Sequence, residues 1–65
     1  MQIYVNDETR DITSDMLGVA LDELGYGKTR IATAVDGTFV PASLRADHRL
    51  HEGARLEILA PMQGG

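Results

Sequence analysis

Short stretches in which hydrophobic and polar residues alternate predict β-strands with one buried face. In the first stretch Ile3 and Val5 share a face, and in the last stretch Leu56 and Ile58 do the same. Three further stretches between them are predicted to form strands. The predicted strands cover residues 1–5, 9–13, 31–35, 38–40 and 55–60.

Two turn sequences connect these strands into hairpins. Residues 6–8 (Asn-Asp-Glu) have side chains that bond their own backbone and tolerate a positive φ. Asp36-Gly37 is a strong signal for a tight two-residue hairpin, and Pro41 then ends the strand that follows it. The pattern in residues 31–35 does not decide which face of this strand is buried. The aliphatic residues on one face favour its burial, whereas Thr33 on the same face favours its exposure.

An amphipathic helix is predicted over about residues 15–24. Its apolar stripe at helical spacing comprises Leu17, Ala20, Leu21 and Leu24. Thr13 or Ser14 is expected to cap its N-terminus, because a side-chain oxygen can accept a hydrogen bond from a free N–H of the first turn. Gly25 is expected to end the helix, since glycine readily adopts the left-handed conformation found there.

The segment 42–53 is predicted to be irregular and to be held to the core by Leu44 and Leu50. The helix must bury its apolar stripe against another element. The sequence therefore predicts an α+β fold: one main helix packs across a mixed sheet of four or five strands, with the first and last strands paired centrally. The expected organisation is one domain over residues 1–60 and a flexible C-terminal tail over residues 61–65.

Length, charge and cysteine content restrict the function. A chain of 65 residues buries only about 60% of its unfolded surface, which leaves no room for a deep substrate cavity. With no cysteine, disulfides, thiolate metal sites and a cysteine nucleophile are excluded. The net charge is −4 with scattered basic residues, so we expect no nucleic-acid binding. No apolar run could form a membrane helix or signal peptide, and we expect a cytoplasmic protein.

Catalytic residue types are present but do not form an evident site. His48 and His51 stand three positions apart in a polar segment, and no other histidine exists to complete a metal site. We interpret both histidines, and the scattered carboxylates, as solvated surface residues. The sequence therefore predicts no catalytic residue, no bound cofactor and no metal site.

The pair Gly64-Gly65 follows the last predicted strand after a short spacer. Because glycine has no β-carbon, such a pair can adopt extended conformations closed to other residues and can enter a channel too narrow for side chains. A carboxylate on Gly65 would then be open to activation by another enzyme. A frayed end or a cut linker would produce the same pair, so the pair alone does not decide the function.

The pentapeptide Pro61-Met62-Gln63-Gly64-Gly65 is the most specific motif of the chain. Together with segments spread over the whole sequence, it resembles the ThiS family of sulfur carriers, which are small ubiquitin-like β-grasp proteins. Two turn positions depart from the family pattern: Asp36 stands where Asn is common, and Ala54 where an acid is common. The other similar segments are residues 3–6, 16–24, 31–37, 40–41, 50–53 and 56–58.

The resemblance implies a cycle of sulfur transfer at Gly65. An E1-like (ThiF-like) adenylyltransferase would use ATP to adenylate the Gly65 carboxylate, and sulfur relayed from a cysteine desulfurase would convert it to a thiocarboxylate. Thiazole synthase (ThiG-like) would accept that sulfur in thiamine biosynthesis. Met62, Gln63 and Gly64 would thread into the partners' active sites. The protein would be a carrier and not an enzyme, and is expected to be a monomer when free.

Tyr4 and Leu59 are predicted to form the surface that partners recognise. If Ile3 and Ile58 face the helix, both residues point away from it on adjacent central strands. They would form an exposed apolar patch near the start of the tail, and such patches often mark interaction sites. The alternative is that both are ordinary half-buried sheet residues.

Three other functions remain open for this sequence. A MoaD-like carrier for molybdopterin synthesis has the same tail and a different sulfur acceptor, although the short spacers here favour the thiamine type. A ubiquitin-like modifier would join Gly65 to lysines through isopeptide bonds. A β-grasp interaction domain would leave the Gly-Gly pair without a role.

Overall fold

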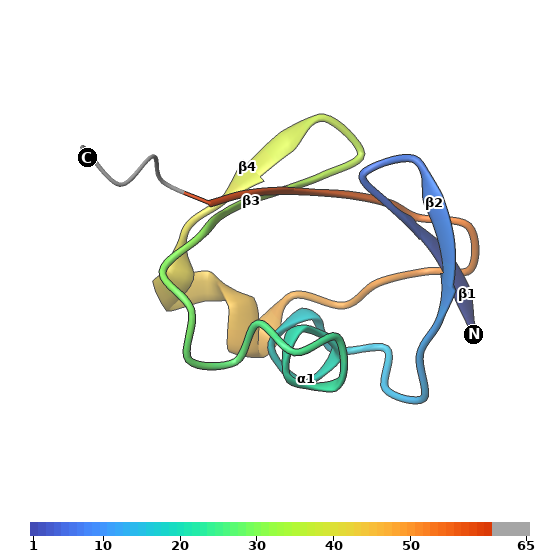
Figure 1. The fold of residues 1–65 in the computed structure, drawn as a ribbon, viewed down its shortest axis with the longest axis horizontal. Helices are drawn as coiled ribbons and strands as arrows, with labels where there is room; N and C mark the ends of the chain where they lie inside the picture. Colours follow the sequence, from blue (N-terminus) through green and yellow to red (C-terminus); the bar gives the residue numbers. More distant parts are fainter. Residues whose placement is uncertain (61–65) are drawn as a thin grey trace.

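The computed structural model describes residues 1–60, and all five predicted strands are found at or near their expected positions (Figure 1). None of the helices in this part of the chain is long and apolar enough to cross a membrane. In chain order the elements are β1 (Gln2–Val5), β2 (Glu8–Asp11), α1 (Leu17–Glu23), β3 (Ala32–Val35), β4 (Thr38–Val40), the 3-10 helix η1 (Ala42–Asp47) and β5 (Arg55–Leu59).

The strands form one mixed sheet in the order β2-β1-β5-β3-β4. β1 and β5 run parallel, with Tyr4 paired to Arg55 and Val5 to Leu56, and the other neighbours are antiparallel. The helix α1 lies across one face of the sheet, and no helix of the described residues covers the other (Figure 1). The predicted ubiquitin-like β-grasp architecture, with a mixed sheet and one main helix, is confirmed.

The core lies between α1 and the covered face of the sheet. Alternation along β1 and β5 directs every second side chain into it, as the sequence pattern predicts. The buried hydrophobic residues are Ile3, Val5, Ile12, Leu17, Ala20, Leu21, Ile31, Val35, Val40, Leu50, Ala54, Leu56 and Ile58.

Thr33 belongs to this buried face, with 1% of its surface exposed. Its hydroxyl donates a hydrogen bond to the carbonyl of Val40 (2.8 Å) and accepts one from Nε of Arg45 (3.0 Å). A buried hydroxyl is tolerated where its hydrogen bonds are made. This resolves which face of β3 is buried.

The helix α1 begins at Leu17, later than predicted. The chain before it pairs with a distant segment instead. The N–H of Leu17 donates to the carbonyl of His48 (2.8 Å), and the carboxylate of Asp15 forms an ion pair with Arg49. Because the bridge between Met16 and Arg49 holds Met16 in extended backbone, the helix starts two residues later than predicted.

The prediction that Thr13 or Ser14 caps the helix is wrong, because Met16 is the N-cap and makes no side-chain cap bond. The hydroxyl of Ser14 accepts from the N–H of Met16 (3.1 Å). The backbone N–H groups of Thr13 and Ser14 donate to the carboxylate of Glu23 (2.8 and 2.9 Å). These bonds, that of Thr13 above all, lower the pKa of Glu23. Residues 13 and 14 are thus held to the last residue of α1 as well as to its N-cap.

The C-terminal end of α1 agrees with the prediction for Gly25, whose φ is +93°. The N–H of Gly25 donates to the carbonyl of Asp22 (3.1 Å), and the N–H of Tyr26 donates to the carbonyl of Leu21 (2.8 Å). These two bonds make a Schellman motif, which satisfies carbonyls that the helix leaves free. Tyr26 packs against the core after this turn.

Both predicted hairpin turns are confirmed. Asn6 and Asp7 have φ of +49° and +71°, and Asp36 and Gly37 have φ of +51° and +83°. Positive φ at both central residues is the mark of a type I′ turn, whose twist matches that of the flanking strands.

The segment predicted to be irregular contains the 3-10 helix η1. Leu50 is buried as predicted, but Leu44 is 56% exposed, so the prediction that Leu44 anchors this segment is wrong. Arg45 takes that role. Its guanidinium donates to the hydroxyl of Thr33 (3.0 Å) and to the carbonyl of Ile31 (2.7 Å), which ties η1 to β3.

Candidate functional site

The candidate site lies at the C-terminal end of β5, because only Ala60 separates this strand from residues 61–65. Alternation in β5 buries Leu56 and Ile58 and leaves Arg55, Glu57 and Leu59 exposed. Leu59 is 71% exposed, the highest value among the large hydrophobic side chains of the described part. An exposed leucine therefore stands two positions before residue 61, where the segment that ends in Gly-Gly begins.

An apolar patch surrounds Leu59 on the open face of the sheet. The antiparallel registers place Leu59 opposite Ala32, and Phe39 opposite Ala34. These four residues, called the β5-end patch below, line a shallow hollow of about 100 Å³. Glu57 lines the same hollow, so the patch has an acidic side chain at its border.

Phe39 is a member of the β5-end patch that the sequence interpretation did not single out. It is the one phenylalanine of the chain, and 64% of its surface is exposed. The alternation in Thr38-Phe39-Val40 contained the signal: once Val40 is buried, Phe39 must point to the opposite face. What the pattern could not indicate is that Phe39 and Leu59 line the same hollow.

Tyr4 is 40% exposed and lies on the strand next to β5, as predicted. It pairs, however, with Arg55 at the start of β5, whereas Leu59 is at the end of that strand. Four residues of extended strand span about 13 Å. The prediction that Tyr4 and Leu59 form one patch near the tail is therefore wrong. Their role in binding partners stays a prediction.

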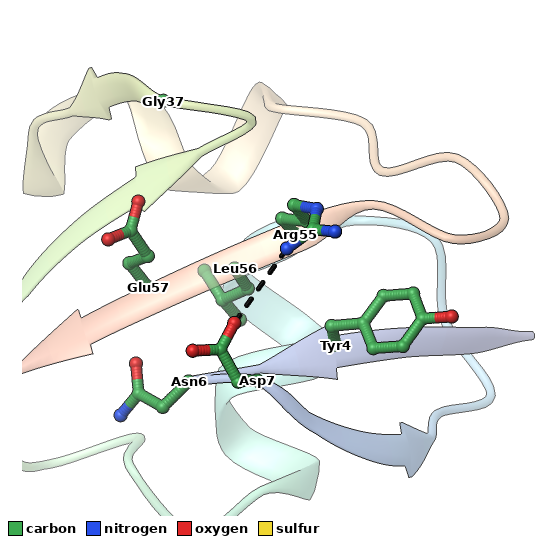
Figure 2. A pocket seen from close by; sticks show the side chains of 7 residues that line it. All are labelled: Tyr4, Asn6, Asp7, Gly37, Arg55, Leu56 and Glu57. Carbon is green, nitrogen blue, oxygen red and sulfur yellow. Dashed lines mark ion pairs between the residues drawn. The ribbon is translucent and has the colours of Figure 1, made fainter.

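Tyr4 instead borders a hollow of about 440 Å³ that also includes Asn6 and Gly37 (Figure 2). The guanidinium of Arg55 lies over the Tyr4 ring, 5.6 Å from its centroid. Nη1 of Arg55 is 3.7 Å from Oδ1 of Asp7, the ion pair drawn in Figure 2. Because both charged side chains are largely exposed, this pair contributes little to stability.

His51 forms an exposed ion pair with the turn residue Asp36. Its Nε2 is 2.7 Å from Oδ2 of Asp36, and its Nδ1 is 2.9 Å from the carbonyl oxygen of Glu52. Both ring nitrogens thus face acceptors, which only the doubly protonated imidazolium can satisfy. The bond to Asp36 accordingly raises the pKa of His51. Two hydrogen bonds lower the pKa of Asp36: the larger effect comes from the backbone N–H of Arg55, and the smaller from the side chain of His51.

The residues predicted to carry the chemistry, Gly65 with Met62, Gln63 and Gly64, lie outside the described residues. Within residues 1–60, His, Asp and Glu side chains form no group of three that could hold a metal ion. The described part of the site is therefore a surface beside the start of the tail.

A mixed sheet crossed by one helix, with Gly-Gly soon after the interior strand β5, defines a ubiquitin-like β-grasp protein of carrier size. The chain matches the model of the ThiS family over residues 3–65, and it belongs to that family. Membership of this family supports a role as a sulfur carrier in thiamine biosynthesis.

A crystal structure of a ThiS thiamine biosynthesis protein from Geobacter metallireducens is similar to this structure. The TM-score is 0.80, and the match covers 100% of both chains at 17% sequence identity. At this identity the similarity establishes the shared fold alone. No curated protein sequence matches the chain.

Proposed function

We propose that this protein carries sulfur as a thiocarboxylate on Gly65 and delivers it to thiazole synthase in thiamine biosynthesis. The observation that carries the proposal is the family match, which runs through the Gly64-Gly65 pair. The protein acts as a carrier and a co-substrate of its partners, and the partners supply the catalytic groups.

The chemistry starts with the Gly65 carboxylate, which attacks the α-phosphorus of ATP in an E1-like, ThiF-like enzyme and releases pyrophosphate. A persulfide derived from a cysteine desulfurase then attacks the acyl carbon, and AMP leaves. A thiol then attacks the S–S bond of the resulting acyl disulfide, forms a new disulfide with the sulfur of the donor, and releases the thiocarboxylate on Gly65. Met62, Gln63 and Gly64 reach into the partner's active site, where the two glycines require little width.

We further propose that the activating enzyme docks on the open face of the sheet. The exposure of Leu59 and Phe39 supports this, because contiguous exposed apolar side chains often mark interaction sites. The β5-end patch is also adjacent to Ala60, the last described residue before the tail. Tyr4 would contact the partner at the other end of the same face.

The proposed modification is tested by an intact mass measurement. The full chain is incubated with ATP, the ThiF-like enzyme, a cysteine desulfurase and cysteine. Replacement of one carboxylate oxygen by sulfur is the expected result, and a chain lacking Gly65 should fold normally and gain no sulfur. Loading of that shortened chain would refute Gly65 as the site, and lysine conjugates in place of the thiocarboxylate would indicate a modifier.

The docking surface is tested with a pair of matched variants. Leu59→Asp places a charge in the β5-end patch, while Val19→Asp places one at another exposed apolar residue, on α1 (49% exposed). Because α1 lies on the opposite face of the sheet, only Leu59→Asp should weaken binding to the activating enzyme. Equal binding by both variants would contradict the proposed surface.

A further inference from the structure

The two sides of β5 are held in different ways. On the β3 side, strand pairing extends to the end of β5, where Leu59 pairs with Ala32. On the β1 side, pairing stops at Val5 and Leu56, because β1 turns away into its hairpin. Ile58 therefore has no strand partner on the β1 side within the described residues.

The side chain of Asn6 occupies the place of that missing strand partner. Its Nδ2 donates to the carbonyl of Ile58 (3.1 Å), and its Oδ1 accepts from the N–H of Ile58 (2.8 Å). The backbone N–H of Asn6 also donates to the carbonyl of Leu56 (2.9 Å). The carboxamide has the same donor and acceptor as a peptide group, so it extends the β1–β5 ladder by one residue.

The residue type at position 6 meets two requirements together. Its φ is +49°, a conformation that asparagine and glycine adopt more readily than other residues. Its side chain must also present one donor and one acceptor to Ile58. Glycine would meet only the first requirement, and aspartate would place a second acceptor against the Ile58 carbonyl.

We propose that Asn6 is a positioning residue for the reaction at Gly65. By holding Ile58 from the β1 side, it fixes the backbone at the end of β5, and hence the point at which residues 61–65 start relative to the β5-end patch. This inference rests on the proposed function, in which a partner docks on that patch and receives the tail.

The inference follows from the reach of an extended chain. Five extended residues span at most about 17 Å, and a tail drawn straight into a narrow channel has little slack. A displacement of its starting point is then passed on to the carboxylate. Misplacement of a reacting group by about 1 Å can reduce a rate by about 100-fold. The loss of the two hydrogen bonds between Asn6 and Ile58 should therefore reduce the rate of adenylation measurably.

The test combines hydrogen exchange with kinetics on the full chain. Asn6→Gly keeps the positive φ and removes both contacts to Ile58. Asp7→Gly is the matched control, since Asp7 also has a positive φ (+71°) and its side chain is 91% exposed. For Asn6→Gly we expect exchange of the Ile58 amide to be about tenfold faster, the factor that corresponds to about 1.4 kcal/mol. Asp7→Gly should leave this exchange unchanged.

Adenylation by the ThiF-like enzyme is then measured as ATP–pyrophosphate exchange, with each variant shown by NMR to be folded. For Asn6→Gly we expect kcat to fall about tenfold and KM for the carrier to stay within about twofold, because the docking face is intact and only the tail is misplaced. Asp7→Gly should match the wild-type protein in both constants. A purely structural role would not separate kcat from KM in this way.

Two results would overturn the inference. One is an unchanged kcat in Asn6→Gly, and the other is unchanged exchange at Ile58. If Asn6→Gly does not fold, Asn6→Asp serves instead, and a wild-type kcat in that variant also overturns it. A wild-type protein that is not adenylated at all would instead refute the proposed function, and this inference with it.

Discussion

Thr33→Val tests whether a buried hydroxyl stabilises this small core more than a methyl group would. Valine has nearly the same shape, so the substitution removes the donor to Val40 and the acceptor for Arg45 without leaving a cavity. Two hydrogen bonds at about 0.5–1.5 kcal/mol each amount to a loss of about 1–3 kcal/mol. Burial of a methyl group in place of the hydroxyl returns about 0.8 kcal/mol.

The expected net destabilisation is therefore about 0.2–2 kcal/mol. The upper end of this range is a large share of the roughly 3–10 kcal/mol expected for a domain of this length. With a urea m-value of about 1 kcal/mol/M for a small protein, the midpoint of unfolding should fall by about 0.2–2 M. Circular dichroism can follow the transition, since the chain has no tryptophan.

Thr38→Val is the matched control, because Thr38 is exposed on the neighbouring strand β4. Its unfolding midpoint should stay close to the wild-type value. Adding Arg45→Met should cost less in the Thr33→Val background than alone, since one of the Arg45 contacts is already lost. A midpoint for Thr33→Val at or above that of Thr38→Val would refute the reasoning.

Two further predictions concern an ion pair and two glycines. Asp36→Asn removes the charge facing His51. The pair's contribution is fully present between the ordinary pKa of Asp, 3.8, and that of His, 6.5, and is lost as pH rises through the raised pKa of His51 or falls through the lowered pKa of Asp36. Melting temperatures of the wild-type protein and Asp36→Asn should therefore differ more at about pH 5.5 than above about pH 9, where only the bond from the N–H of Arg55 still favours the Asp36 carboxylate; a pH-independent difference would contradict the assignment. Gly18→Ala should raise the free energy of unfolding by about 0.5–1 kcal/mol, because a Cβ there would lie 3.4 Å from Cα of Ala46, in ordinary contact. Gly25→Ala should lower it by about 1 kcal/mol, because φ is +93°; urea midpoints in the reverse order would contradict both expectations.

Features that depend on neighbouring residues were predicted well from the sequence. The alternation in the strands and the Asp36-Gly37 turn are local properties, since side-chain direction and positive φ are decided within a few residues. The predictions for the start of α1 and for Leu44 failed for a shared reason. The extended backbone at Met16 depends on pairing with Arg49, and η1 is held to β3 by Arg45, so both depend on distant contacts.

The sequence by itself determined the five strands, the stripe of the helix, the ThiS family resemblance and Gly65 as the residue to test. Only the tertiary structure decided which exposed side chains are neighbours. It places Phe39 and Leu59 around one hollow, separates Tyr4 from Leu59 along β5, and sets the side-chain amide of Asn6 against Ile58. The physical reason is that periodicity specifies the face on which a side chain lies, whereas the register between strands specifies its position along that face. Register arises from pairing between segments far apart in the chain, and periodicity within one strand contains no information about it.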